Sequence, residues 1–314
     1  MTNTDLKITV MGLGGIGGLL SGALIRRYGP AVSLIARGKR AESLRTNGLV
    51  LHSHYFGEFT VQPACVTDDP STLPVQDIVL VCVKNGGLET AARQLQPIVD
   101  EHTLVLPVLN GVSASENLEK YLGRGHVLDS VIYTVSSAGE DFSITQLGNF
   151  TTIHMGAVHP EDAPHAAALC DVLKEAGIDC RLNEDIRAAI WNKYVLNCAY
   201  NVMTARHACT IGDVQADPTL LAHYRGLMEE AYQVGLAMGV NLAPTLVEKN
   251  MKRLDKTDPA STSSLSRDFD AGIVGEMDIF TGDMIRMADA CGTPIPLTRD
   301  YHQGLLERVA RFGK

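Results

Sequence analysis

Residues 7–27 read KITVMGLGGIGGLLSGALIRR and decide the fold of the amino-terminal half. Residues 7–11 are a short β-rich run and residues 19–27 have helical composition, so we predict a strand, a tight turn and a helix. The glycines between them are spaced G-x-G-x-x-G, which allows a tight turn, close approach of backbone to a pyrophosphate, and packing of helix on strand. Outside this context three glycines would indicate only a turn. The residues expected to hold a dinucleotide here are Gly12, Leu13, Gly14, Gly15, Ile16 and Gly17.

Strands and helices continue to alternate after this unit. The further strands that we predict are at residues 32–36, 77–83, 103–109, 127–135 and 151–157. A crossover helix is expected at 88–95, and strands joined in this way form a parallel, doubly wound sheet. Residues 49–54 and 57–61 meet near a glycine and predict a hairpin.

The character of the chain changes near residue 183, after which it reads as helical. The helices that we predict are at residues 185–205, 218–238, 243–252, 266–290 and 298–311. At 314 residues the chain is long enough for two domains, each with its own core. We therefore predict an α/β protein, with an N-terminal Rossmann doubly wound sheet over residues 1–183 followed by an all-helical C-terminal domain over residues 184–314.

Composition and charge exclude several classes of protein. The formal net charge of −9 argues against a nucleic-acid or anionic-membrane partner, because both are bound mainly through Lys and Arg. The sequence has neither a signal-peptide pattern at its start nor an apolar run long enough to span a bilayer, which predicts a cytoplasmic protein. Its seven cysteines include no C-x-x-C pair, which favours free thiols in a reducing compartment.

A basic cluster follows the second predicted strand. An enzyme that uses NAD commonly has an acid there to bind the ribose 2′-hydroxyl, but this chain has Arg37, with Lys39 and Arg40 close behind. A guanidinium complements a 2′-phosphate with two parallel hydrogen bonds, so Arg37 predicts NADP as the cofactor. The alternative is a solvated basic loop.

Two polar residues follow the next strands of the sheet. Lys84 comes after the predicted strand 77–83 and Asn110 after 103–109. Open α/β sheets bind ligands outside the carboxyl ends of their strands, so both are candidates for the nicotinamide side of the site. A solvated lysine and a turn-forming Asn-Gly pair are the alternatives.

The first helix of the second half carries a polar stripe. Lys193, Asn197 and Asn201 are spaced i, i+4 and i+8, and most other residues of this helix are apolar. A lysine on a buried helix must face a cleft, be paired or lose its charge. Lys193 is therefore a candidate general acid that protonates a carbonyl oxygen as hydride reaches the carbon. The alternative is a structural stripe paired with another helix.

A second titratable candidate is Glu276, which stands among apolar residues on the predicted helix 266–290. It could be the partner of Lys193. The sequence does not show that these two segments meet.

Taken together, these motifs resemble the ketopantoate reductase family over nearly the whole chain. The matching elements, in order, are the glycine motif, Ala36-Arg37-Gly38, Val83-Lys84, Asn110-Gly111, Trp191-Asn192-Lys193 with Asn197 and Asn201, Ser263-Ser264-Leu265 with Asp268, Glu276-Met277-Asp278, and Pro294-Ile295-Pro296. Two positions depart from the family's pattern, Val202 where proline is common and Thr281 where asparagine is common.

The resemblance implies a fold, an activity and a set of residue roles. It implies an NADP-binding Rossmann domain and a helical substrate domain with the site between them, and reduction of 2-dehydropantoate to pantoate by NADPH in pantothenate and coenzyme A synthesis. Lys193 would be the proton donor, and Glu276 would bind substrate or cofactor or position the lysine. The residues that would contact substrate are Asn110, Asn197, Asn201 and Ser264. The resemblance also implies that the chain can form a homodimer.

Other functions stay open at this point. A related enzyme could act on another 2-oxo acid or a hydroxy acid, and a non-catalytic NADP sensor would keep the glycines without needing Lys193 or Glu276. No metal site is expected, because the H-x-H pair His52 and His54 has no companion Cys or carboxylate spacing. The remaining histidines that we considered for such a site are His102, His126, His154, His159 and His165.

Overall fold

The protein divides into two compact units, Met1–Ile186 and Arg187–Lys314. The computed structural model describes residues 6–313 of the chain. Within them, no helix is both long and apolar enough to cross a membrane.

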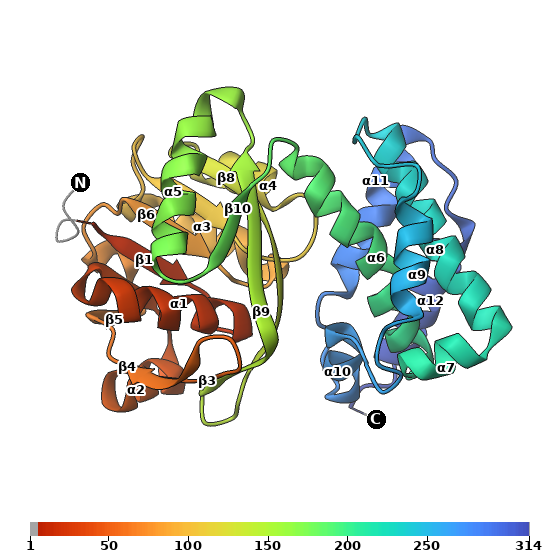
Figure 1. The fold of residues 1–314 in the computed structure, drawn as a ribbon, viewed down its shortest axis with the longest axis horizontal. Coiled ribbons are helices and arrows are strands. Elements are labelled where there is room, and N and C mark those ends of the chain that lie inside the picture. Colours follow the sequence, from red (N-terminus) through yellow and green to blue (C-terminus); the bar gives the residue numbers. More distant parts are fainter. Residues whose placement is uncertain (1–5, 314) are drawn as a thin grey trace. The chain divides into compact units, whose positions relative to one another are not determined.

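The first unit is built on a parallel sheet (Figure 1). Its parallel strands are β1 (Ile8–Met11), β2 (Val32–Ile35), β5 (Cys65–Thr67), β6 (Ile78–Val81), β7 (Leu104–Pro107) and β8 (His126–Ala138). They lie in the order β5-β2-β1-β6-β7-β8, each parallel to its neighbours. The chain runs outward from β1 in one direction and then from β6 in the other, so a crevice for ligands is expected at the carboxyl ends of these two strands.

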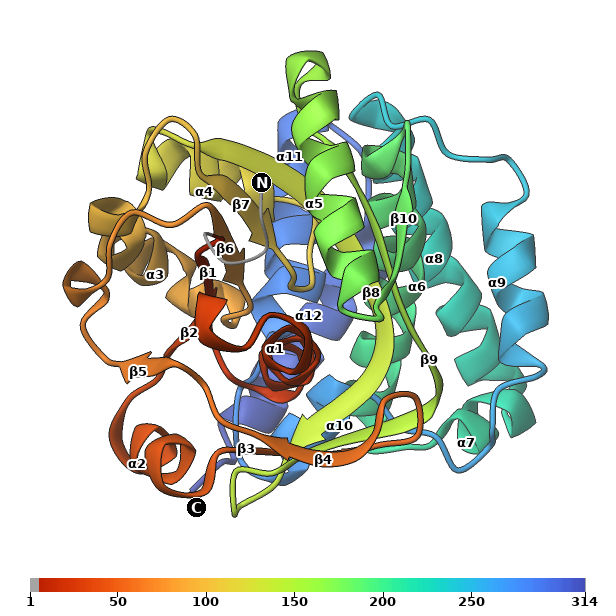
Figure 2. The same cartoon turned by 60° about the vertical axis from the view of Figure 1, so that its left-hand side comes forward.

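Helices cover both faces of this sheet, as Figure 2 shows. The α-helices of this unit are α1 (Gly15–Tyr28), α2 (Gly38–Asn47), α3 (Leu88–Leu95), α4 (Ala114–Leu122) and α5 (Ala163–Glu175). Leu19 and Leu24 of α1 share one apolar core with Leu169 of α5, whereas Ala92 of α3 and Leu118 of α4 belong to a second core. The short 3-10 turns are Gly29–Ala31, Pro70–Thr72, Asn85–Gly87, Gln96–Ile98 and Pro160–Asp162. The predicted doubly wound arrangement is confirmed.

Beyond β8 the sheet continues with mixed directions. β9 (Ile144–Ala157) is antiparallel to β8 and parallel to β3 (Leu49–Ser53) and β10 (Asp179–Leu182). β3 forms the predicted antiparallel hairpin with β4 (Gly57–Val61). Residues 127–135 and 151–157 do extend the sheet, in strands longer than predicted because each is the other's main pairing partner. In the first unit, the strands and α-helices that the sequence did not indicate are β5, β10, α2, α4 and α5.

The second unit is helical. Its helices are α6 (Ile186–His207), α7 (Ile211–Ala216), α8 (Pro218–Ala237), α9 (Leu246–Leu254), α10 (Ser264–Asp270), α11 (Asp283–Cys291) and α12 (Pro296–Val309). The prediction of one helix over 266–290 is wrong. Gly272 and Gly275 take φ values of +70° and +59°, which no continuous α-helix tolerates, and a π-helical turn, Asp278–Gly282, follows.

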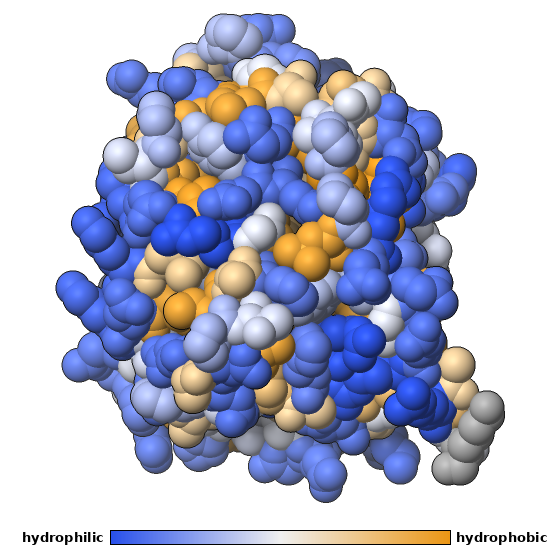
Figure 3. Space-filling model, turned by 90° about the vertical axis from the view of Figure 1, so that its right-hand side faces the viewer, coloured by the Kyte–Doolittle hydropathy of each residue, from blue (hydrophilic) through white to orange (hydrophobic). Residues whose placement is uncertain are grey.

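The face of the molecule in Figure 3 is mostly hydrophilic, with small apolar patches separated by polar residues. Among the described residues of the second unit, the exposed large apolar side chains are Leu236, Ile273, Val274 and Leu306. Ile273 and Val274 stand out because both lie in the turn between the two positive-φ glycines, immediately before Glu276.

Candidate active site

The glycine loop, residues 12–17, follows β1 directly, and we call it the glycine cradle. Two of its glycines have no space for a larger side chain. A Cβ on Gly17 would lie 1.9 Å from the carbonyl oxygen of Gly12, and Gly12 itself has a φ of +93°. A Cβ on Gly15 would lie 2.4 Å from the carbonyl oxygen of Ser136. Helix α1 therefore sits directly on the turn and on β8, as the G-x-G-x-x-G spacing predicts.

Gly14 differs from its neighbours. Its Cβ position is open, with no protein atom within 4 Å. Gly14 is also the N-cap of α1, where no side-chain cap and no acidic residue of the first turn occupies the helix N-terminus. A helix N-terminus with free backbone N–H groups and open space in front of it attracts anions. The loop thus fits the pyrophosphate of a dinucleotide, with Leu13 and Ile16 completing its backbone.

The basic cluster after β2 lies at the start of a second helix. Arg37 is the exposed N-cap of α2, and α2 also has no acid in its first turn. Arg40 does not reinforce it as the sequence suggested, because its guanidinium donates to the carbonyl oxygen of Leu13 and stacks 4.9 Å from the centre of the Phe142 ring. Arg37 and Lys39 remain as exposed cations beside the α2 N-terminus, an arrangement that suits a 2′-phosphate.

Replacing Arg37 with alanine should raise the KM for NADPH by about 10- to 100-fold, because one charge-assisted pair to a phosphate contributes about 1.5–3 kcal/mol. Steady-state kinetics with NADPH and NADH would measure the effect. In Arg37→Ala the KM for NADH should stay within about twofold of the wild-type value. Lys39→Ala should change the KM for either cofactor much less than Arg37→Ala changes the KM for NADPH. Equal losses for both cofactors would contradict an Arg37 contact with the 2′-phosphate.

The loops after β6 and β7 are joined by a hydrogen bond. Asn85 Nδ2 donates to the backbone oxygen of Asn110 over 2.6 Å. Lys84, the residue before Asn85, is exposed, and Asn110 is half-buried. Both lie at the carboxyl edge that also carries Gly12, because β6 and β7 are parallel neighbours of β1. The sequence reasoning missed Asn85, although Asn85-Gly86-Gly87 is a turn signal at a strand end.

In the second unit, α6 carries Lys193, Asn197 and Asn201 as the spacing predicts, on a helix whose other residues are mostly buried. Lys193 and Asn197 are half-buried. Burial lowers the pKa of Lys193 to about 8, against a smaller opposite effect of the Glu276 carboxylate; the Arg253 guanidinium lowers it further. An ammonium with a pKa near neutrality is well matched to proton transfer.

Asn201 connects α6 to α10. It is 4% exposed, and its Oδ1 accepts hydrogen bonds from Ser264 Oγ at 3.3 Å and from the backbone N–H of Leu265 at 3.4 Å. Its Nδ2 donates to the backbone oxygen of Asn197. The structure therefore brings together three of the predicted substrate residues, and Asn201 holds the start of α10 so that Ser264 lies beside the stripe.

Glu276 lies in a turn, not inside a helix as the sequence predicted. The turn is held from α10, because a Cβ on Gly275 would come within 2.4 Å of the Asp268 carboxylate. The Glu276 carboxylate acts to raise the pKa of Lys193, so the two groups lie within electrostatic range of each other. That Glu276 is the partner of Lys193 stays a prediction.

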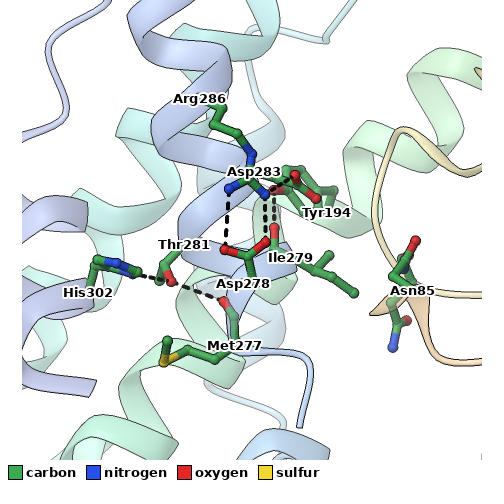
Figure 4. A network of polar contacts seen from close by, with 10 residues as sticks. Asn85, Tyr194, Met277, Asp278, Ile279, Thr281, Asp283, Arg286 and His302 are labelled. Carbon is green, nitrogen blue, oxygen red and sulfur yellow. Dashed lines mark hydrogen bonds and ion pairs between the residues drawn. The ribbon is translucent and has the colours of Figure 1, made fainter. Parts of the chain in front are cut away.

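A π-helical turn fixes the segment after Glu276 (Figure 4). Its displaced carbonyl groups find side-chain partners, since Tyr194 Oη donates to the Ile279 oxygen at 2.6 Å and Thr281 Oγ1 donates to the Met277 oxygen at 3.0 Å. Thr281, one of the two departures from the family pattern, also bonds to His302 Nδ1 at 2.8 Å. Tyr194 lies one position after Lys193, so α6 braces this turn directly.

Replacing Tyr194 with phenylalanine should lower the free energy of unfolding by about 1–3 kcal/mol, because the buried Ile279 carbonyl loses its donor. Urea unfolding would measure this difference. Tyr232→Phe, a half-buried tyrosine of α8, serves as the matched control and should change stability much less. An unchanged unfolding midpoint for Tyr194→Phe would show that this hydrogen bond does not hold the π-helical turn.

The sequence reasoning gave no role to two further residues near the stripe. Arg253, exposed near the end of α9, acts on Lys193 from another helix, and nothing in the sequence links them. Asn192, adjacent to Lys193, has a buried Oδ1 without a hydrogen-bond partner in the part of the chain that the structure describes. A buried acceptor beside the candidate acid is suited to a ligand's hydroxyl or to water.

The fold and the glycine cradle place this protein among the dinucleotide-binding oxidoreductases. Residues 8–160 match the family model of ketopantoate reductase PanE/ApbA, and residues 185–305 match that of its C-terminal domain. The chain belongs to the ketopantoate reductase family. It is accordingly an oxidoreductase with NADP as its cofactor.

Individual relatives agree with this assignment. A 2-dehydropantoate 2-reductase from Mesorhizobium japonicum is 27% identical over 325 residues, covering 97% of this chain and 98% of the relative. The crystal structure of a PanE/ApbA family ketopantoate reductase from Ralstonia eutropha has a TM-score of 0.88 at 29% identity, covering 98% of this chain and all (100%) of the other. A ternary structure of D-mandelate dehydrogenase has the same TM-score, 0.88, at 18% identity over 98% of this chain and 100% of that one, which shows the fold alone.

Proposed function

We propose that this enzyme reduces 2-dehydropantoate to pantoate with NADPH. The observation that carries the proposal is Lys193, a half-buried lysine whose pKa is lowered to about 8 and which interacts with Glu276. The names of the family and of its relatives support 2-dehydropantoate as the substrate.

The residues divide the chemistry among them. NADPH, when bound in the glycine cradle, supplies the hydride that reaches C2 of the oxo acid. Lys193 donates a proton from Nζ to the carbonyl oxygen as that oxygen gains charge, and Glu276 orients the ammonium. The amides of Asn110 and Asn197 and the hydroxyl of Ser264 provide the polar contacts that hold substrate. Asn201 contributes by positioning Ser264, because its own amide oxygen and nitrogen are already engaged.

The charge near Lys193 supports a substrate with a carboxylate. Lys193 and Arg253 are both cationic groups of the second unit, and the Arg253 guanidinium lowers the pKa of Lys193. A bound 2-oxo acid would bring a negative charge between such cations and relieve that repulsion. Arg253 therefore provides electrostatic attraction for the acid group.

The test is the rate of NADPH oxidation with 2-dehydropantoate, beside a panel of other 2-oxo acids of different side-chain size. We expect 2-dehydropantoate to have the highest kcat/KM by at least tenfold. If another 2-oxo acid exceeds it, the substrate assignment fails while the reaction type stands. Sedimentation of the same preparation tests the predicted homodimer.

A related enzyme acting on another oxo or hydroxy acid is the second candidate. D-mandelate dehydrogenase, whose structure matches this one with a TM-score of 0.88, has the same fold and is named after a different acid. Thr281 and Val202, the two departures from the family pattern, lie in the second unit, as do all of the proposed substrate residues except Asn110. A non-catalytic sensor is disfavoured, because it would need neither Lys193 nor its interaction with Glu276.

A further inference from the structure

In the first unit, His126 meets two residues of a later segment of the chain, Asp162 and His165. Asp162 Oδ1 lies 2.6 Å from His126 Nδ1 and 3.1 Å from His165 Nδ1. The two imidazole rings lie 3.8 Å apart between centroids. All three candidate ligand atoms lie within 4.8 Å of one another. We call this group the His-Asp-His cluster.

The local structure directs these side chains toward one another. His126 is the first residue of β8, Asp162 ends a 3-10 turn, and His165 stands in the first turn of α5. Asp162 occupies the N-cap of α5, a position where Asp commonly accepts hydrogen bonds from the helix, yet it makes no such cap bond. Its carboxylate turns instead to the two imidazoles.

Burial makes this carboxylate unusual. Asp162 is 5% exposed, while the side chains of His126 and His165 are 29% and 39% exposed. One divalent cation held between the carboxylate and the two imidazoles would neutralise the charge of Asp162, which is costly to bury without a compensating cation.

The donor set and the spacing fit a transition metal. Two imidazole nitrogens and one carboxylate oxygen are ligands of zinc and similar ions, whose bonds of about 2.0–2.2 Å place tetrahedral ligands about 3.3 Å apart. The observed separations of 2.6 and 3.1 Å need only small outward shifts of the side chains. The partial exposure of both rings leaves a fourth position for water.

We propose that His126, Asp162 and His165 bind a divalent transition-metal ion of the zinc type. The ion would tie β8 to α5. His126 pairs with Leu104, the first residue of β7, so the cluster lies at the amino edge of the parallel strands, opposite the edge of Gly12 and Asn110. Its role is therefore to stabilise the first unit.

The sequence predicted no metal site, and the H-x-H pair takes no part in this cluster. His52 lies on β3 beside Glu58, but His54 falls after the strand, where its Nδ1 accepts a hydrogen bond from Gly148. The sequence could not have indicated Asp162 as the missing carboxylate, because it lies 36 residues from His126.

The test uses the full-length protein, treated with a chelator and then titrated calorimetrically with zinc chloride. We expect one equivalent to bind and to raise the melting temperature, and His126→Ala and His165→Ala each to weaken binding by at least tenfold. His102→Ala, which removes a histidine with an 85% exposed side chain, is the matched control and should bind zinc like the wild type.

A second measurement separates this cluster from the free cysteines. Cobalt chloride should give the visible bands of a tetrahedral nitrogen and oxygen site, without thiolate charge-transfer absorption, and these bands should be absent in His165→Ala. The proposal is overturned if zinc binding is the same in the wild type and both cluster variants, if only thiolate bands appear, or if the chelator-treated protein binds no zinc.

Discussion

Replacing Lys193 with alanine is expected to lower kcat for the reduction by about 10²- to 10⁴-fold, the usual contribution of a positioned general acid. The substitution removes the proton donor and leaves the glycine cradle untouched, so the dissociation constant of NADPH should remain near the wild-type value. Stopped-flow oxidation of NADPH and fluorescence titration measure the two quantities. A variant that keeps more than a tenth of the wild-type kcat would remove Lys193 from the proposed mechanism.

Two companion variants sharpen this result. Lys252→Ala removes an exposed lysine of α9 and should leave kcat unchanged. Lys193→Arg keeps a positive charge, but a guanidinium does not release its proton near neutral pH, so kcat should remain low. Recovery of activity in Lys193→Arg would show that charge alone suffices.

The pKa of Lys193 also predicts a pH dependence. Reduction needs the protonated ammonium, whose pKa burial lowers to about 8, so kcat/KM for the oxo acid should fall as the pH rises through about 8. Oxidation of the hydroxy acid needs the neutral amine and should rise over the same range. A rate profile that stays flat from pH 7 to about pH 10 would contradict this role.

The second large effect is expected at Gly17, with Gly14 as its matched control. Gly17→Ala places a methyl group 1.9 Å from the backbone oxygen of Gly12, so α1 must move away from β1. The free energy of unfolding should fall by about 3 kcal/mol or more. Gly14→Ala meets no protein atom within 4 Å and should cost about 1 kcal/mol or less.

NADPH affinity should distinguish the two variants in the opposite way from stability, with the larger effect expected for Gly14→Ala. Gly14→Ala fills the open space in front of the α1 N-terminus, where the pyrophosphate must approach, so the dissociation constant of NADPH should rise at least tenfold, a loss of about 1.4 kcal/mol. Urea unfolding and fluorescence titration of both variants test the pair. A folded Gly14→Ala variant with unchanged NADPH affinity would mean that the pyrophosphate binds elsewhere.

Local patterns in the sequence predicted much of the fold and part of the site. Residues 7–27 form the strand, turn and helix as expected, and α6 is buried with Lys193 and Asn197 on its partly exposed side. These features depend on the spacing of residues within one element, which the sequence shows directly. The short elements β5, β10 and α2 gave no such pattern, because pairing and packing with distant segments stabilise them.

Only the tertiary structure could decide which distant groups meet. The sequence alone determined the class of fold, through the alternation of its strands and helices, and the spacing of residues within single elements indicated the glycine cradle and the candidate acid. The turn at Glu276, the contact of Arg40 with Leu13, the hydrogen bond from Asn85 to Asn110 and the His-Asp-His cluster depend on long-range packing. Each polar partner there is chosen by proximity in space, because a buried polar group must find whichever complementary group the fold brings near it.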